Sequence, residues 1–251
     1  MKNLIALLFI ASYIFPIYGQ HKEVRKLSAH QSISVATSLD VLYVPSDRNE
    51  IVLDCANRDH LQLILTDVKN GNLQIQYKPN SSVKSSKQNK VIVYSNYKIH
   101  TVKVSSSSKL RLESAVNANT VNITTNSSGK FYADRIKANT INLDLSSSGQ
   151  LEAAIVTETL NLTASSSGKG FLKGEAVSAN VNMSSSAKLD LDNVTISNLF
   201  CDGSSSARLQ INTAKTLKSK LSSSATLAYS KEPAKIVENK TSSSGRLLKK
   251  S

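Results

Sequence analysis

The sequence predicts an all-β protein, a right-handed parallel β-solenoid of about eight serine-rich rungs of 18 to 21 residues, preceded by a strand-rich N-terminal cap. Two observations predict the solenoid. A Ser-Ser-Ser motif followed by a small residue recurs at a nearly constant interval through the second half of the chain. Apolar residues alternate with polar ones on both sides of the motif, as in β-strands. The hand follows because parallel crossovers within one sheet are almost always right-handed.

The serine motif occurs eight times, and Gly, Ala or Ser follows it. A fixed period is typical of proteins whose units stack on one another. Stacking is needed because one rung of about twenty residues buries too few aliphatic side chains to offset the entropy lost on ordering it. A disordered serine-rich linker is the alternative, but a linker does not keep the period-two register of apolar residues.

The register also predicts an inner ladder of serine hydroxyls. Alternate residues from Ile141 to Ile155 are aliphatic or small, and the alternation continues through the triplet. On this register the middle serine of each triplet points into the coil, where hydroxyls stacked about 4.8 Å apart can bond one another. The expected members are Ser106, Ser127, Ser147, Ser166, Ser185, Ser205, Ser223 and Ser243.

A second ladder, of asparagines, is expected on the outer surface. Asn122, Asn142 and Asn161 each stand seven residues before the small residue of their repeat, and Asn182 stands in a slightly shortened repeat. Stacked asparagine side chains stabilise in-register strands. We therefore expect these four amides to follow one another along the outside of the coil.

The chain divides into three predicted segments. Residues 1–19 have the pattern of a signal peptide, with Lys2, an apolar stretch from Leu4 to Ile17 and Gly19 before the expected cut. Residues 20–104 are predicted to form antiparallel strands that cap the solenoid, and Asn70-Gly71 is a hairpin signal. Residues 105–251 are the predicted solenoid.

The signal peptide predicts an exported protein that is periplasmic, exposed at the outer cell surface or secreted. The apolar stretch is too short to span a bilayer comfortably, and no second apolar run of that kind follows it. After removal of the signal we expect no transmembrane segment. Cys55 and Cys201 lie in strand-like segments, where we expect buried free thiols and no disulfide.

The net charge of +13 is explained most simply by a solvated surface. Attraction to anionic glycans, lipopolysaccharide or membranes is the alternative, but no run of basic residues marks a site for it. Nucleic acid is not an expected partner, because aromatic and basic residues are not interleaved as they are in nucleic-acid-binding proteins.

An enzyme acting on polysaccharides is the rival interpretation, since β-helical folds also carry such activities. All four histidines precede the repeats, and none has metal-ligand spacing. Asp190 and Asp192 share an outward face but have no counterparts in adjacent rungs. No Gly-x-Ser-x-Gly sequence marks a nucleophile. We therefore predict no catalytic residues, no metal site and no cofactor.

The N-terminal segment with Asn70-Gly71-Asn72-Leu73-Gln74-Ile75 and Val91-Ile92-Val93-Tyr94, followed by tandem Ser-Ser-Ser-Gly rungs, resembles the auto-transporter adhesin head domain family, also called the GIN domain. The resemblance covers nearly the whole chain after the signal and implies an exported β-solenoid protein of Bacteroides-type bacteria without established catalytic residues. We expect a non-enzymatic protein that binds a glycan or a protein through a regular solenoid face.

Overall fold

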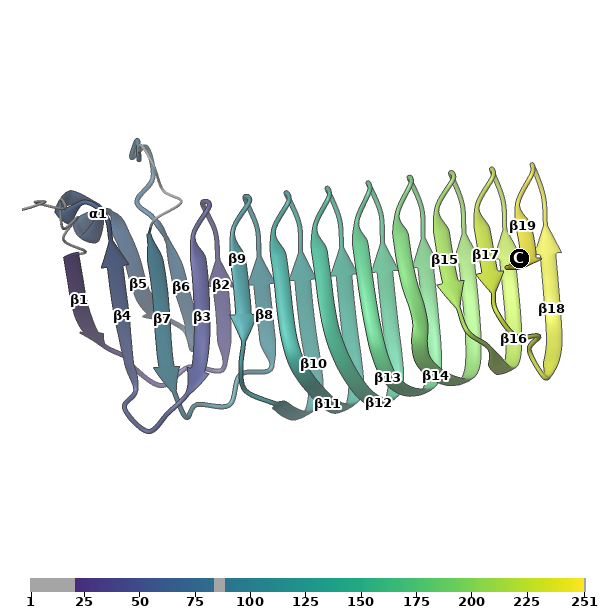
Figure 1. Cartoon of the computed structure of the whole chain (residues 1–251), viewed down its shortest axis with the longest axis horizontal. Helices are drawn as coiled ribbons and strands as arrows, with labels where there is room; N and C mark the ends of the chain where they lie inside the picture. Colours follow the sequence, from purple (N-terminus) through teal and green to yellow (C-terminus); the bar gives the residue numbers. More distant parts are fainter. Residues whose placement is uncertain (1–20, 84–88, 251) are drawn as a thin grey trace, which may run out of the picture.

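The computed structural model describes residues 21–83 and 89–250, which form 19 strands and one short helix. The predicted signal peptide lies outside the described residues. Figure 1 shows an elongated coil with the N-terminal region at one end and the last coil at the other. No helix in the described part of the chain is long and apolar enough to cross a membrane.

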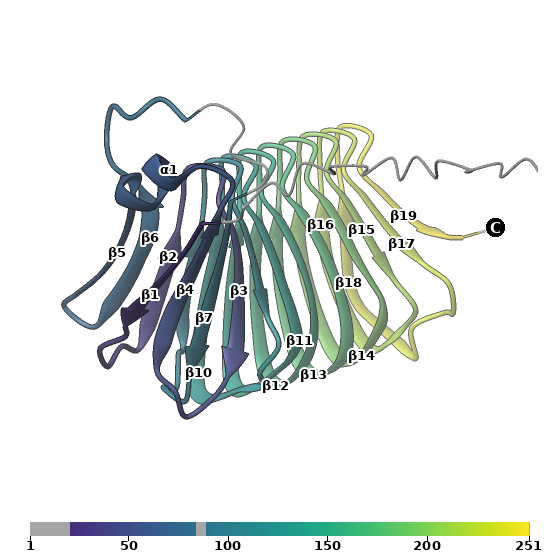
Figure 2. The same ribbon diagram turned by 60° about the vertical axis from the view of Figure 1, so that its left-hand side comes forward.

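Each coil consists of two strands joined by a tight turn, and successive coils pair in parallel, so the strands form two walls. β11, β12, β13 and β14 bend from one wall into the other, as Figures 1 and 2 show. The first wall contains β3 (Asp40–Pro45), β9 (Lys109–Leu112), the first halves of β11 (Lys130–Leu145), β12 (Gln150–Ala164), β13 (Lys169–Met183) and β14 (Lys188–Gly203), β15 (Arg208–Ile211), β17 (Thr226–Tyr229) and β19 (Arg246–Lys249). The second wall contains β2 (Ser32–Val35), β8 (Thr101–Val104), β10 (Val116–Thr125), the second halves of β11 to β14, β16 (Ala214–Leu221) and β18 (Lys235–Thr241).

The coil is right-handed, as predicted. In Figure 1 the near wall runs downward and the fainter far wall runs upward while the chain advances from left to right. The eight serine turns enclose about seven complete coils, slightly fewer than the eight predicted rungs. The predicted β-solenoid is thus confirmed with a corrected count.

Aliphatic and small side chains stacked in register fill the interior. One such row contains Leu143, Leu162, Val181 and Cys201, all buried. Both cysteines are buried and free, as predicted. Burial raises the pKa of the Cys55 thiol to about 11, and it also raises the pKa of Cys201.

The N-terminal region contains the expected antiparallel pairs. β1 (His21–Lys26) pairs with β4 (Glu50–Cys55), β4 pairs with β7 (Lys90–Ser95), and β5 (Ile64–Lys69) pairs with β6 (Asn72–Tyr77) across the Asn70-Gly71 turn. The single helix α1 (Arg58–Leu63) lies at this end, and its N-cap residue Asn57 accepts the backbone N–H of Asp59 at 2.9 Å.

The coiled architecture begins earlier than the sequence suggests. β2 and β3 pair in parallel with β8 and β9, and Thr37 and Ser38 between them have φ angles of 64° and 58°, like the serine turns. This coil lies before the predicted boundary at residue 105. The sequence did not reveal it because Ala36-Thr37-Ser38-Leu39 lacks the serine triplet.

Candidate functional site

Each serine triplet and its small residue form a tight reverse turn. At residues 146–149, Gly149 donates its backbone N–H to the carbonyl oxygen of Ser146 at 2.7 Å. Ser147 and Ser148 between them have φ angles of 45° and 63°. Positive φ at both central residues defines a type I′ turn, whose twist suits two adjoining strands. Both central side chains are exposed at the outer edge of the coil.

The expected inner ladder of hydroxyls is therefore wrong. The period-two register does not run through the triplet, because the turn reverses the chain there and its two central side chains project outward. The small residue after the triplet is the one near the interior. All eight middle serines have positive φ and are exposed: Ser106, Ser127, Ser147, Ser166, Ser185, Ser205, Ser223 and Ser243.

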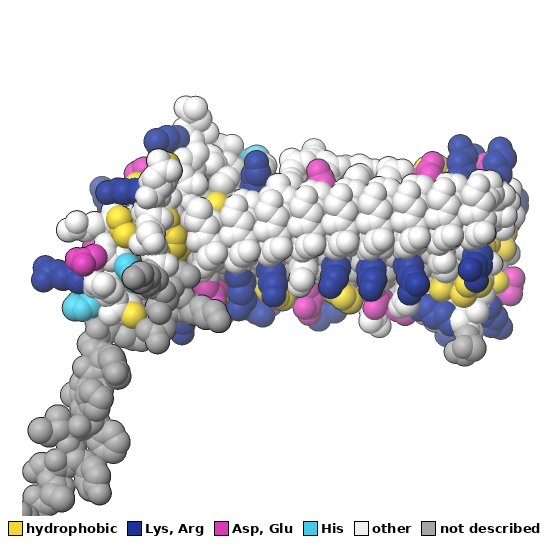
Figure 3. All heavy atoms as spheres, turned by 90° about the horizontal axis from the view of Figure 1, so that it is seen from above, with side chains coloured by type: hydrophobic (Ala, Val, Ile, Leu, Met, Phe, Trp, Pro, Cys, Tyr) yellow, Lys and Arg dark blue, Asp and Glu magenta, His cyan; other side chains and the backbone are white. Residues whose placement is uncertain are grey.

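Backbone hydrogen bonds link each turn to the next. Ser148 donates its N–H to the carbonyl oxygen of Ser166 at 2.9 Å, and Ser167 donates to Ser185 at 2.9 Å. Left-handed backbone costs a non-glycine residue roughly 1–2 kcal/mol, and these bonds help offset that cost. The stacked turns make one continuous surface, the serine stripe, which carries no charged side chains in Figure 3.

Close approach between coils explains the small residue after each triplet. A Cβ placed on Gly149 would lie 2.2 Å from the carbonyl oxygen of Thr125 in the preceding coil. Ser108 occupies the equivalent position in an earlier turn, and its hydroxyl donates to the carbonyl oxygen of Val35 at 2.9 Å. Glycine avoids this contact, and the buried hydroxyl of Ser108 is satisfied by its hydrogen bond to the preceding coil.

A row of basic side chains runs along one edge of the serine stripe, visible as a blue line in Figure 3. The residue after each small residue begins a strand of the first wall, and parallel pairing aligns these residues from coil to coil. We call this row the basic edge. Its eight positions are Lys109, Lys130, Gln150, Lys169, Lys188, Arg208, Thr226 and Arg246.

In the described part of the chain, most side chains of the basic edge lack a carboxylate partner. Lys109 lies 3.6 Å from a carboxylate oxygen of Asp40. Within the described residues, the other five cations of the row form no ion pair. Sequence reasoning missed this row because its members are about twenty residues apart and make no local run. The recurrent cation directly after the small residue is the signal that could have revealed it.

The next outward-facing row of the same wall mixes aromatic, acidic, basic and uncharged side chains. Tyr132, Glu152, Phe171 and Asp190 are in register. The guanidinium of Arg111 lies 5.2 Å from the centre of the Tyr132 ring, within cation–π range. Phe171 is 48 % exposed. The basic edge is therefore one side chain wide, with hydroxyls on one side and this mixed row on the other.

The asparagine ladder lies on the second wall. Asn142 donates to Asn122 at 2.8 Å, Asn161 donates to Asn142 at 2.9 Å, and Asn180 donates to Asn161 at 2.9 Å, in each case from Nδ2 to Oδ1. Asn182 is not the fourth member, because it pairs with Thr163, two residues farther along the strand. Asn180 stands seven residues before Ala187, so the spacing of the other members selects it.

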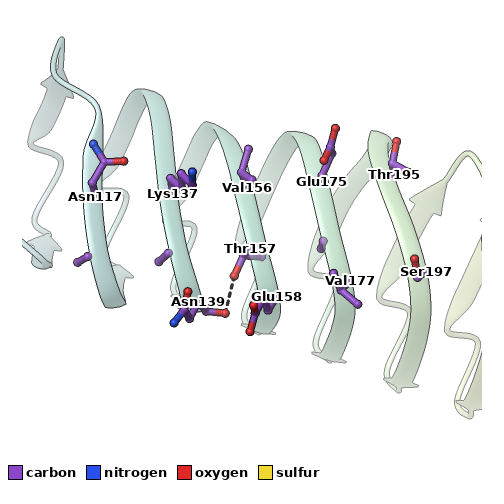
Figure 4. A pocket seen from close by; sticks show the side chains of 13 residues that line it. Asn117, Lys137, Asn139, Val156, Thr157, Glu158, Glu175, Val177, Thr195 and Ser197 are labelled. Atoms are coloured by element: carbon purple, nitrogen blue, oxygen red, sulfur yellow. Dashed lines mark hydrogen bonds between the residues drawn. The ribbon is translucent and has the colours of Figure 1, made fainter.

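An open groove of about 580 Å³ lies at the bend opposite the serine turns (Figure 4). Its floor includes Ala138 and Thr157, whose hydroxyl donates to the carbonyl oxygen of Asn139 at 3.0 Å. The side chains along its rims are of mixed character: Glu158 and Glu175 carry negative charge, Lys137 carries positive charge, and Val156 and Val177 are apolar. Sequence reasoning did not identify this groove.

The acidic residues considered for catalysis make structural contacts. Asp190 accepts the backbone N–H of Asp192 at 3.0 Å, and the Asp192 carboxylate pairs with Lys250. His30 is buried and lies 3.0 Å from the Tyr43 hydroxyl, and burial lowers its pKa. Residues 21–83 and 89–250 contain no group of three His, Cys, Asp or Glu side chains placed to hold a metal ion.

Several solved structures share this fold. A protein described as a putative adhesin from Parabacteroides distasonis superposes with a TM-score of 0.80 at 16% identity, over 92% of this chain and 97% of the other. A putative adhesin from Parabacteroides merdae superposes with a TM-score of 0.76 at 17% identity, over 92% of this chain and 96% of the other. A Parabacteroides distasonis protein described as a putative lipid binding protein superposes with a TM-score of 0.71 at 18% identity, over 92% of this chain and 97% of the other.

A comparison with proteins of curated function finds no match. The family model described as "Putative auto-transporter adhesin, head GIN domain" matches residues 29–233, which include the antiparallel cap except for β1 and most of the solenoid. That span contains seven of the eight serine turns and most of the basic edge. The chain belongs to this adhesin head GIN domain family.

Proposed function

We propose that this protein is an exported, non-enzymatic binding protein that holds a glycan or a protein of the cell envelope against the outer face of its solenoid. One observation carries the proposal: eight turns stack into a continuous, uncharged and regular serine stripe. A repeated surface of this kind suits a partner that is itself extended.

The filled interior supports a surface role. The largest side chains facing into the coil, such as Phe131, Leu110 and Ile123, are almost completely buried by neighbouring coils. Ligands contact such a coil from outside, through the turns, the walls or the groove. The names of similar structures are consistent with binding, since two are described as adhesins and one as a lipid binding protein.

The arrangement of acidic groups favours a binding protein over an enzyme that acts on polysaccharides. General acid–base chemistry needs carboxylates free to exchange protons near a substrate. Asp190 accepts a backbone N–H and Asp192 pairs with Lys250, so both make contacts that hold the coil together. Binding through hydroxyls and cations requires no such pair.

Site-directed blocking tests the proposal. The cysteine introduced by Ser166→Cys is coupled to a bulky maleimide, and binding to a glycan array and to envelope proteins is compared with that of unlabelled protein. Cys55 and Cys201 are buried with raised pKa values and should stay unlabelled. We expect the label at Ser166 to abolish binding.

The matched control carries the same label at Val177, which is 53 % exposed on the rim of the groove. Binding should survive this label. Loss of binding only with the Val177 label would move the site to the groove. Cleavage of an array glycan that is abolished by Asp190→Asn would replace the binding function with an enzymatic one.

A further inference from the structure

We propose that the basic edge binds a linear polyanionic polysaccharide, laid along the solenoid axis beside the serine stripe. This inference rests on the proposed function and names the class of ligand and the residues that select it. Six of the eight positions of the edge are lysine or arginine, at Lys109, Lys130, Lys169, Lys188, Arg208 and Arg246.

The spacing of the row is fixed by the fold. Residues paired in register on adjacent strands repeat about every 4.8 Å, so the eight positions extend over about 34 Å. The backbone that carries them is held by hydrogen bonds between coils, such as Lys188 N–H to the carbonyl oxygen of Gly168 at 2.9 Å. The backbone positions of the cations are therefore fixed before a ligand arrives, so that the protein loses only side-chain entropy on binding.

The positive charges of the row repel one another in the free protein. Lys169, Lys188 and Arg208 lie directly opposite one another on three consecutive strands, an arrangement of like charges that destabilises a sheet. Elsewhere the same register joins opposite charges, as where Lys218 lies 2.6 Å from Glu238. An anionic partner along the edge would neutralise the repulsion that the fold leaves uncompensated.

A single row of positive charges matches a linear polyanion better than it matches a broad anionic surface. The basic edge is one side chain wide, and Glu152 and Asp190 lie in the next row of the same wall. Those carboxylates would repel the broad surface of an anionic membrane or of a nucleic acid duplex. A single polyanionic chain can follow the row of cations and stay clear of these carboxylates.

The neighbours of the edge fit a sugar polymer. The serine stripe offers hydroxyl groups that donate and accept hydrogen bonds, the complement of sugar hydroxyls, carboxylates and sulfates. On the other side, Phe171 is 48 % exposed and presents a flat apolar face next to Lys169, two residues earlier on the same strand. Such a face can cover the C–H surface of a sugar ring.

The test compares two triple variants of equal charge in the full protein. One removes cations from the edge by Lys169→Gln, Lys188→Gln and Arg208→Gln. The control removes three exposed lysines from other parts of the solenoid by Lys137→Gln, Lys173→Gln and Lys215→Gln. Dextran sulfate is the probe, with neutral dextran beside it, and the dissociation constant is measured at several salt concentrations. Thermal unfolding shows whether each variant is folded.

We expect dextran sulfate to bind the unmodified protein, and neutral dextran not to bind. The edge variant should bind about tenfold or more weakly, since three charge contacts are lost, while the control changes about threefold or less. The dependence of affinity on salt should also be shallower for the edge variant, because fewer counterions are released.

Equal losses in both variants would show attraction by net charge alone and would overturn the inference. Preferential binding to vesicles of phosphatidylglycerol, or to a DNA duplex, would overturn it in favour of those partners. A third outcome is that the protein binds an uncharged glycan or a protein but not dextran sulfate, and that the Ser166 label blocks this binding. This outcome would overturn the inference and leave the proposed function intact. Failure of the Ser166 label to block any ligand would count against the proposed function itself.

Discussion

Ser148 donates its backbone N–H to the carbonyl oxygen of Ser166, at 2.9 Å, across two successive turns of the coil. Both residues have positive φ, of 63° and 46°. The bond shows that the serine corners belong to the hydrogen-bonded ladder between coils. Backbone hydrogen bonds therefore tie successive corners together, and the hydroxyls project from a regularly repeated backbone.

The left-handed backbone at these corners predicts how substitutions will act. Ser166→Gly should leave the free energy of unfolding unchanged or raise it, because glycine adopts positive φ without a steric cost. Ser166→Val should lower it by about 1–2 kcal/mol, because a β-branched side chain is strongly disfavoured there. Urea denaturation of both variants measures the difference. Equal stability of the two would contradict the assigned turn.

The asparagine ladder predicts different costs for two neighbouring residues. Asn161 donates to Asn142 and accepts from Asn180, so Asn161→Ala should cost about 1 kcal/mol. Asn182→Ala should be nearly neutral, because the Asn182 side chain has no part in the ladder. Melting temperatures of the two variants test this, and a larger loss for Asn182→Ala would show that the ladder follows the other register.

The buried hydroxyl of Thr125 marks a position where a substitution should stabilise the protein. Its side chain is buried between Val104 and Leu145 of the adjacent coils, and its hydroxyl has no hydrogen-bond partner among the described residues. Thr125→Val should raise the free energy of unfolding by about 1 kcal/mol, since it removes an unsatisfied polar group while keeping the shape. As a control, Ser219→Ala should lower it, because the Ser219 hydroxyl donates to Asn239 at 2.8 Å. Calorimetry showing the same sign for both would refute this prediction.

Alanine substitutions at Gly174 and Gly71 distinguish the cost of backbone strain from the cost of steric contact between coils. Both have positive φ, but a Cβ on Gly174 would lie 2.1 Å from the carbonyl oxygen of Ile155, and a Cβ on Gly71 would have no neighbour within 4 Å. Gly71→Ala should cost about 1 kcal/mol and Gly174→Ala about 3 kcal/mol or more. Chemical denaturation that gives equal costs would mean that the coils are not this closely stacked at Gly174.

The sequence predicts the architecture well because a solenoid repeats its own local signals. The period and the apolar rows followed from the triplets and their flanking residues, and the hand followed from the general rule for parallel crossovers. Asn122, Asn142 and Asn161 lie where their spacing indicated. The orientation of the middle serines could not be predicted in this way. Type I′ turns usually carry Asn-Gly, and serine is held in this backbone by bonds to the next coil, which are long-range contacts.

The basic edge escaped prediction for a related reason. Lys169 and Lys188 are 19 positions apart in the sequence and become neighbours only through the register of β13 and β14. The first coil was missed because Thr37 and Ser38 make the turn without a triplet. In each case the missing information is which residues pair across coils, and a single repeat does not contain it.

The rate of thiol labelling at one engineered cysteine tests the central claim most directly, that the serine stripe is an outward surface used for binding. Cysteine at position 166, introduced by Ser166→Cys, should react as fast as an unfolded peptide thiol, whereas Ala187→Cys, at a buried position, should react only on unfolding. Dextran sulfate should slow labelling at position 166. Slow labelling of position 166 in the free protein would contradict the turn and the outward stripe, and a rate unchanged by dextran sulfate would contradict binding of a polyanion beside the stripe.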